Sequence, residues 1–297
     1  MNFTKIKLLA IAIVTCSVFS ISCNEVLYVD LPNFESKLVV ESIIFKTDSI
    51  SVGISRSVSP YMKSNSEDTT RLVHNAKVTL INDGVEYALK EDTSVIYFYS
   101  NLRATRKFSN YYVKPDNFIL GKELLLKIKH GDVEVSSSAE TPTNTNVKSI
   151  NTYLSSEESR YTDFHHLTLN FKMKADFPKN IKNYYRIAAV IEYYRGGVLW
   201  QRTREIEELF EVVSSDSTFD FKIYLGNMAK DLEIRNPILI IDHITEEYYN
   251  FLKAVKMQFE HDESLIESEV TRIPSNIKNA YGIFTIIARD TVCFELN

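Results

Sequence analysis

Segments in which apolar and polar residues alternate with a period of two recur along this chain of 297 residues. That period places the apolar side chains on one face of an extended strand and the polar side chains on the other. Such segments in the first half are 50–55, 76–80, 85–90 and 124–129. Tight-turn sequences join them, such as NDG at 82–84 and HGD at 130–132. Strands joined by turns rather than by helices predict antiparallel hairpins packed as a β-sandwich.

The same alternation returns in the second half of the chain, at 167–174 and 219–225. Segments 183–194 and 198–210 flank Arg195-Gly196-Gly197 and predict one long hairpin, and a last strand is expected at 282–288.

One segment has a different period. In 245–261, Tyr248, Leu252, Val255 and Phe259 follow one another at spacings of four, three and four, which predicts an amphipathic helix. Thr245 is a suitable N-cap residue. The expected fold class is therefore all-β, with two β-sandwich domains, the second of which carries one α-helix at about 245–261.

The amino terminus predicts a lipoprotein signal. Lys5 and Lys7 precede an uncharged apolar stretch, Leu8–Ser22, which is shorter than the roughly 20 residues of a membrane-spanning helix. Small residues lead to Cys23, as in a bacterial lipobox, although Ser20 occupies the position of the usual leucine. We expect residues 1–22 to be a signal peptide and Cys23 to be acylated, which anchors the chain to membrane lipid. The alternative is an ordinary secretory signal in which Cys23 is an incidental core residue.

The expected domains follow from these segments. The first β-sandwich spans 23–143, and the C-terminal β-rich domain with the helix spans 147–297. The Ser/Thr/Pro-rich segment 136–146 is the candidate linker between them.

Composition argues against several functions. The net charge of −5 disfavours nucleic acid as a partner, and loss of Lys5 and Lys7 with the signal makes the chain more acidic. The eight glycines are scattered, so no GxGxxG or GxxxxGK[ST] phosphate-binding loop occurs. No cofactor is expected.

No motif indicates catalysis. Asp163 and His165 could point to one face of a strand, but two ligands do not make a zinc site, so no metal is expected. No GxSxG motif occurs. Cys293 is expected to be a buried, inert thiol. We therefore expect that this protein is not an enzyme. The alternative among enzymes is a hydrolase whose catalytic residues are dispersed along the sequence.

Aromatic residues are the one remaining binding signal, with 17 Tyr and 17 Phe. The segment 96–101 is expected to be a strand with aromatics on both faces, and 110–113 to lie in a loop. Exposed aromatics beside Asn and Ser suit a polar ligand or a protein partner. The alternative is that these rings belong to an ordinary two-sided sheet. The candidate ligand-binding residues are Tyr97, Tyr99, Tyr111, Tyr112 and Trp200.

Several segments also carry a resemblance to a known family. They are KLVVESII (37–44), HNAKVTLINDG (74–84), AETP (139–142), FKMKADFPKNIKNYYR (171–186), TEEYYNFL (245–252) and SNIKNAYGIFTI (275–286). With the lipobox, their order resembles the Bacteroidota outer-membrane lipoproteins grouped as domain of unknown function 4249, over the whole mature chain. Ala280 and Glu123 depart from the pattern, where a glycine and an aromatic residue are expected.

The resemblance implies a location and a partner. It implies an outer-membrane lipoprotein, on the surface or the periplasmic face, that accompanies a TonB-dependent transporter as a non-enzymatic accessory or ligand-capture subunit. It also implies sandwiches of the Ig-like or transthyretin-like kind. A structural or adhesive cell-envelope protein is the alternative function.

Overall fold

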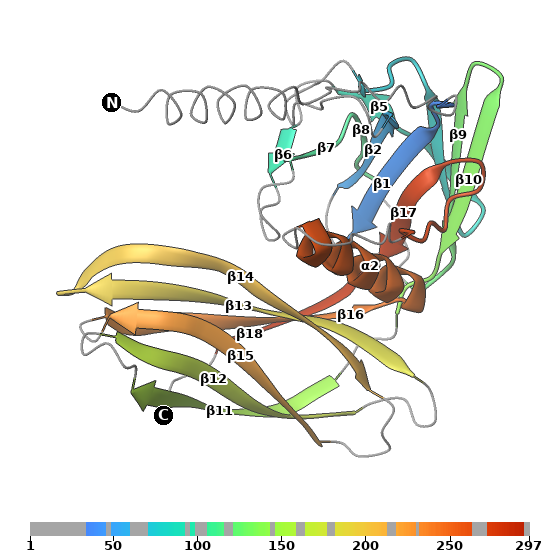
Figure 1. Cartoon of the computed structure of the whole chain (residues 1–297). Coiled ribbons are helices and arrows are strands. Elements are labelled where there is room, and N and C mark those ends of the chain that lie inside the picture. The colour runs from blue at the N-terminus through green and yellow to red at the C-terminus, as the bar shows by residue number, and fades with distance from the viewer. Residues whose placement is uncertain are drawn as a thin grey trace, which may run out of the picture. The chain divides into compact units, whose positions relative to one another are not determined.

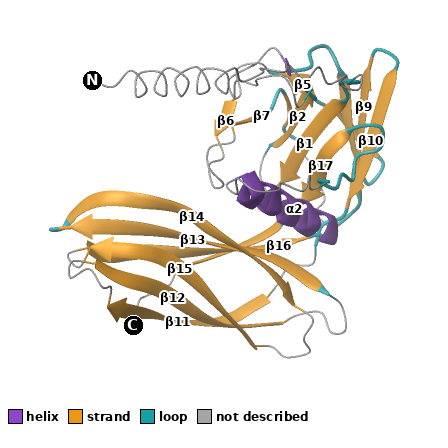
Figure 2. Ribbon diagram, in the orientation of Figure 1, coloured by secondary structure: helices purple, strands orange, loops and turns teal. Residues whose placement is uncertain are grey.

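Strands make up most of the computed structural model of this chain (Figure 1). The structure describes residues 34–45, 49–59, 71–92, 96–98, 106–115, 121–142, 146–158, 164–176, 182–212, 218–229, 232–262 and 272–293. Within these ranges one α-helix accompanies the strands (Figure 2). The predicted all-β class is confirmed.

The N-terminal strands, together with β17 (Tyr281–Ile286) from near the end of the chain, form two sheets around one core. The first sheet has the order β17-β1-β2-β8-β5 and the second the order β10-β9-β3-β4. Inward-facing side chains of both sheets, such as Val40, Val52, Leu80 and Leu126, belong to a single buried cluster, as in a β-sandwich. The strands are β1 (Leu38–Ile44), β2 (Ile50–Arg56), β3 (Lys77–Asn82), β4 (Val85–Ala88), β5 (Lys90–Glu91), β8 (Tyr111–Val113), β9 (Leu124–His130) and β10 (Val133–Ala139), with β6 (Ile96–Phe98) and β7 (Arg106–Phe108) paired separately.

The predicted hairpins of this part are present. Asp83 and Gly84 both have positive φ between β3 and β4, as a two-residue hairpin turn of type I′ requires. Gly131 has a positive φ in the turn between β9 and β10.

The C-terminal strands form a second pair of sheets around a second core. Their orders are β11-β12-β15 and β14-β13-β16-β18. Phe171 and Phe221 of the first sheet stack at 4.6 Å between ring centroids and share a cluster with Tyr185 and Ile241 of the second. The strands are β11 (Asn146–Glu158), β12 (Phe164–Asp176), β13 (Asn183–Arg195), β14 (Val198–Val212), β15 (Thr218–Ala229), β16 (Leu232–Ile244) and β18 (Ala288–Cys293).

The helix α2 (Glu246–Asp262) confirms the period seen in the sequence. Thr245 caps it, since its Oγ1 accepts a hydrogen bond from the Tyr248 amide at 3.3 Å. Tyr248 and Leu252 are buried in a third cluster, which also contains Tyr184 of β13 and Ile283 of β17 (Tyr281–Ile286).

The last expected strand, 282–288, is in fact two strands. β17 ends at Ile286 and β18 begins at Ala288. β17 pairs in parallel with β1, whereas β18 pairs antiparallel with β16. The domain boundary predicted from the sequence places residues 281–286 in the C-terminal domain. In the structure, the backbone of these residues is hydrogen-bonded to β1, in a sheet of the N-terminal sandwich.

Two further local predictions are wrong. Tyr111–Val113 forms β8, paired with β2, rather than a loop, because the Tyr111 ring fills the core. The candidate linker begins too early, since residues 136–139 complete β10 and pair with β9.

Candidate functional site

Tyr111 is a core residue rather than a surface aromatic. Its side chain is 1% exposed, its hydroxyl donates to the Val73 carbonyl oxygen at 2.9 Å, and that hydroxyl accepts from the Ala76 amide at 3.0 Å. Burial raises the pKa of Tyr111. The ring is therefore inaccessible to a ligand, and it joins β8 to the segment that precedes β3.

Glu91 lies beside this tyrosine and completes a local polar cluster. Its carboxylate accepts from the Asn75 amide at 2.8 Å and lies 2.6 Å from Nδ1 of His74. These contacts lower the pKa of Glu91, the amide hydrogen bond most strongly. Asn75 has a positive φ of 59°, so the cluster holds a strained turn in place.

The structure describes the backbone of three of the other four predicted aromatic residues. Tyr112 is half-buried in β8, while Tyr97 lies in β6 and Trp200 in β14, with side chains outside the description. Cys23 and Tyr99 lie outside the described residues. Ligand binding at Tyr97, Tyr99, Tyr112 and Trp200, and acylation of Cys23, stay predictions.

The predicted burial of Cys293 is wrong. Its thiol is free and exposed, because the residue ends β18 at the edge of its sheet.

A buried carboxylate joins three strands of the C-terminal sheet. Asp242 of β16 is 1% exposed and accepts hydrogen bonds from Arg186 of β13 at 2.9 Å and from Arg289 of β18 at 2.6 Å. The guanidinium of Arg289 also lies 4.3 Å from the ring centroid of Phe45. The Asp242 carboxylate is buried and is paired with both guanidinium groups, which indicates a structural role.

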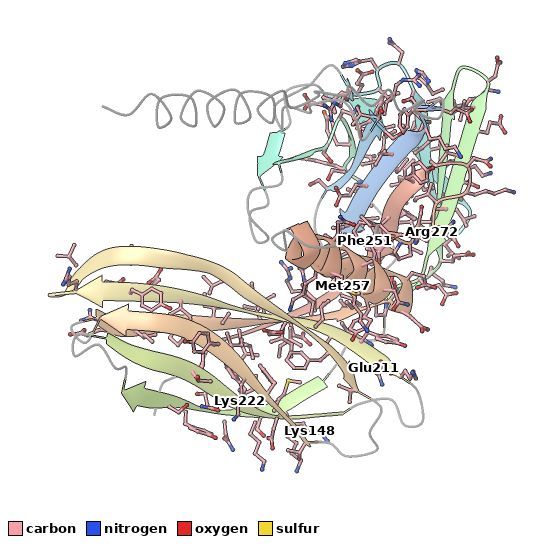
Figure 3. All side chains as sticks on the ribbon, in the orientation of Figure 1. Lys148, Glu211, Lys222, Phe251, Met257 and Arg272 are labelled. Carbon is pink, nitrogen blue, oxygen red and sulfur yellow. The ribbon has the colours of Figure 1, made fainter. Side chains whose placement is uncertain are left out.

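The outer face of the β11-β12-β15 sheet has a different character. Its core-facing side chains, such as Leu169 and Ile223, alternate with side chains that point away from the core. We name the outward set the lysine–tyrosine face, and Figure 3 labels one of its lysines, Lys222. It includes Tyr153, Asn170, Lys172, Lys174, Asp220, Lys222 and Tyr224.

Two tyrosines flank the centre of this face. Tyr153 on β11 and Tyr224 on β15 are each 56% exposed, which is unusual for rings of that size on a sheet. Between them Asn170 of β12 is only 5% exposed, and its Nδ2 donates to Ser155 Oγ at 2.9 Å and to the Thr168 carbonyl oxygen at 3.2 Å. A buried asparagine therefore lies between two exposed rings.

Sequence reasoning missed this face, although a signal was present. In 219–225, Tyr224 occupies a polar position of the alternation, where a large aromatic ring must lie in solvent. Tyr153 shows the same feature in β11, which the sequence analysis did not identify as a strand.

Among the described residues, no group of three or more His, Cys, Asp or Glu side chains is placed to hold a metal ion. No helix in the described part of the chain has the length and apolar character needed to cross a membrane.

The fold and the face define a class: an all-β chain of sandwich type that carries an exposed aromatic and cationic sheet surface. A family model described as Domain of unknown function (DUF4249) matches residues 24–292, and the chain belongs to that family. A search of curated proteins found no match.

Proposed function

We propose that this chain is a non-enzymatic lipoprotein, acylated at Cys23 on the outer membrane, that captures a ligand for a TonB-dependent transporter. The observation that carries the proposal is the apolar stretch Leu8–Ser22 followed directly by Cys23. The family match covers residues 24–292, the part of the chain that follows this cysteine.

The proposed mechanism is an increase in local concentration. An acyl anchor at Cys23 confines the binding surface near the membrane and raises its effective concentration at a transporter without any new contact. Two or more acyl chains suffice for stable attachment, since each buried methylene contributes about 0.8 kcal/mol.

Acylation is tested by replacing Cys23 with alanine in the full chain expressed in a Gram-negative host. We expect wild-type protein to incorporate radiolabelled palmitate and to sediment with membranes, and Cys23→Ala to do neither. Cys293→Ala is the matched control, because it removes an exposed thiol and should leave labelling unchanged. Labelled, membrane-bound Cys23→Ala protein would disprove the anchor.

The transporter association needs a separate test. Purification of the wild-type chain from its native membranes in mild detergent should recover a large barrel transporter in stoichiometric amount. Membrane-bound protein that never co-purifies with a transporter would favour the structural or adhesive alternative.

A further inference from the structure

We propose that the lysine–tyrosine face binds an acidic oligosaccharide, one that carries uronate carboxylates or sulfates. This inference rests on the proposed ligand-capture function and names the class of ligand.

The two tyrosines are spaced for a ligand of several sugar rings. Tyr153 is opposite Asn170, and Asn170 is opposite Lys222, while Tyr224 lies two residues further along β15. Two strand spacings and two residues along a strand separate the two Cα atoms by roughly 12 Å. Each ring offers an apolar face for stacking and a hydroxyl for hydrogen bonding, a combination that suits the faces and edges of a pyranose.

The charges on the face favour an anion. Lys172, Lys174 and Lys222 are all exposed, and Asp220, opposite Lys172, is the acidic side chain nearest to them in register. Glu157 lies further along β11, opposite His166. An excess of positive charge here contrasts with the net charge of −5 of the whole chain, so the face attracts anions that the rest of the surface repels.

Hydrogen bonds fix one side of the floor of the face. Asn170 of β12 is buried and hydrogen-bonded to Ser155 of β11 and to the Thr168 carbonyl oxygen of its own strand, so it joins β12 to β11 beside Tyr153. Because the rings stand on paired strands rather than on loops, little conformational entropy is lost when they take up a ligand.

Other ligand classes fit less well. Protein interfaces are depleted in lysine, which disfavours a protein partner. The two tyrosines are the large exposed hydrophobic side chains of this face, which leaves little aliphatic surface for insertion into a bilayer. Single-stranded nucleic acid also stacks on aromatic rings and is also an anion, so oligothymidylate is a competing probe in the test.

The test measures binding to the full-length, detergent-solubilised protein by titration calorimetry. The probes are a galacturonate hexamer, a chondroitin sulfate hexasaccharide and, as the neutral control, cellohexaose. We expect an acidic probe to bind at least tenfold more tightly than cellohexaose. Binding should weaken as the salt concentration rises from about 0.05 M to about 0.5 M, because salt screens exposed charges.

Two sets of variants locate the site. Tyr153→Ala combined with Tyr224→Ala should weaken binding about tenfold or more, whereas the corresponding double phenylalanine variant should retain most of it, because phenylalanine keeps the apolar ring faces on which a sugar stacks. Lys172→Glu combined with Lys222→Glu should weaken binding and reduce its dependence on salt.

Matched controls lie on other sheets. Lys77→Glu combined with Lys127→Glu makes the same charge change on strands β3 and β9, and Tyr281→Ala removes an exposed tyrosine of β17. Both should bind like wild type. Equal weakening by these controls would overturn the proposed site.

Three other outcomes would overturn the inference. They are no binding of either acidic probe, equal affinity for cellohexaose, and tighter binding of oligothymidylate or of phosphatidylglycerol vesicles than of the acidic sugars. Each leaves the anchor untouched, because palmitate labelling at Cys23 is measured independently. A failed anchor in turn leaves the calorimetry valid.

Discussion

At the scale of single residues, the most constrained position is Asp242. A carboxylate in the apolar segment ILIIDHI at the end of β16 is costly to bury unless it is paired. The register solves this, because Arg186 and Arg289 are the direct neighbours of Asp242 on the strands at either side. Two guanidinium groups therefore compensate one buried charge and join β13, β16 and β18.

We expect Asp242→Asn to destabilise the fold by about 3–5 kcal/mol, because it leaves arginines near a buried, uncharged partner. The measurement is the free energy of unfolding from urea titration. Glu233→Gln is the control, since its partner Arg235, at 2.6 Å, forms an exposed ion pair that contributes no more than about 1 kcal/mol. An equal loss of unfolding free energy in both variants would show that the two arginines do not compensate the buried charge of Asp242.

At the scale of elements, β17 depends on a glycine. Gly282 is opposite Val40 in the parallel pairing with β1 and has a φ of 117°, which L side chains rarely adopt. A Cβ atom at this position would overlap the backbone carbonyl group of Val40. The pairing of β17 with β1 is thus possible because residue 282 has no side chain.

Gly282→Ala should therefore cost about 2–5 kcal/mol of stability, through backbone strain and steric overlap together. Gly121→Ala separates the two causes, because Gly121 also has a positive φ, 91°, but open space around its Cα. It should cost only about 1–2 kcal/mol. Urea titration of both variants gives the comparison, and a Gly282→Ala variant as stable as Gly121→Ala would contradict the described approach of β17.

At the scale of the whole molecule, a strand near the end of the chain, β17, joins the sheet that contains the first strand, β1. β17 hydrogen-bonds to β1, one residue follows, and β18 hydrogen-bonds to β16. Ile283 and Ile287 belong to the cluster of Tyr184 and Tyr248, so the same side chains contribute to both parts of the described fold. Two sandwiches connected in this way should unfold together.

Trp200, the single tryptophan, allows that cooperativity to be measured. It lies in β14, whereas Gly282 lies in the sheet of β1. We expect Gly282→Ala to shift the urea midpoint of Trp200 fluorescence by the same amount as the midpoint of far-ultraviolet circular dichroism. A fluorescence midpoint that stays at its wild-type value would mean that the two parts unfold independently.

The sequence by itself determined the class of structure. Three signals are local, because each depends only on residues close together in the chain. They are the alternation with a period of two, the NDG turn and the apolar stripe in 245–261, and the structure contains the strands, the turn and the helix that they predict. Only the tertiary structure decided the partner of β17, the burial of Tyr111 and the gathering of lysines and tyrosines around Asn170. The physical reason is that strand pairing between distant segments depends on which apolar faces pack together, and a period along one strand carries no information about its neighbours.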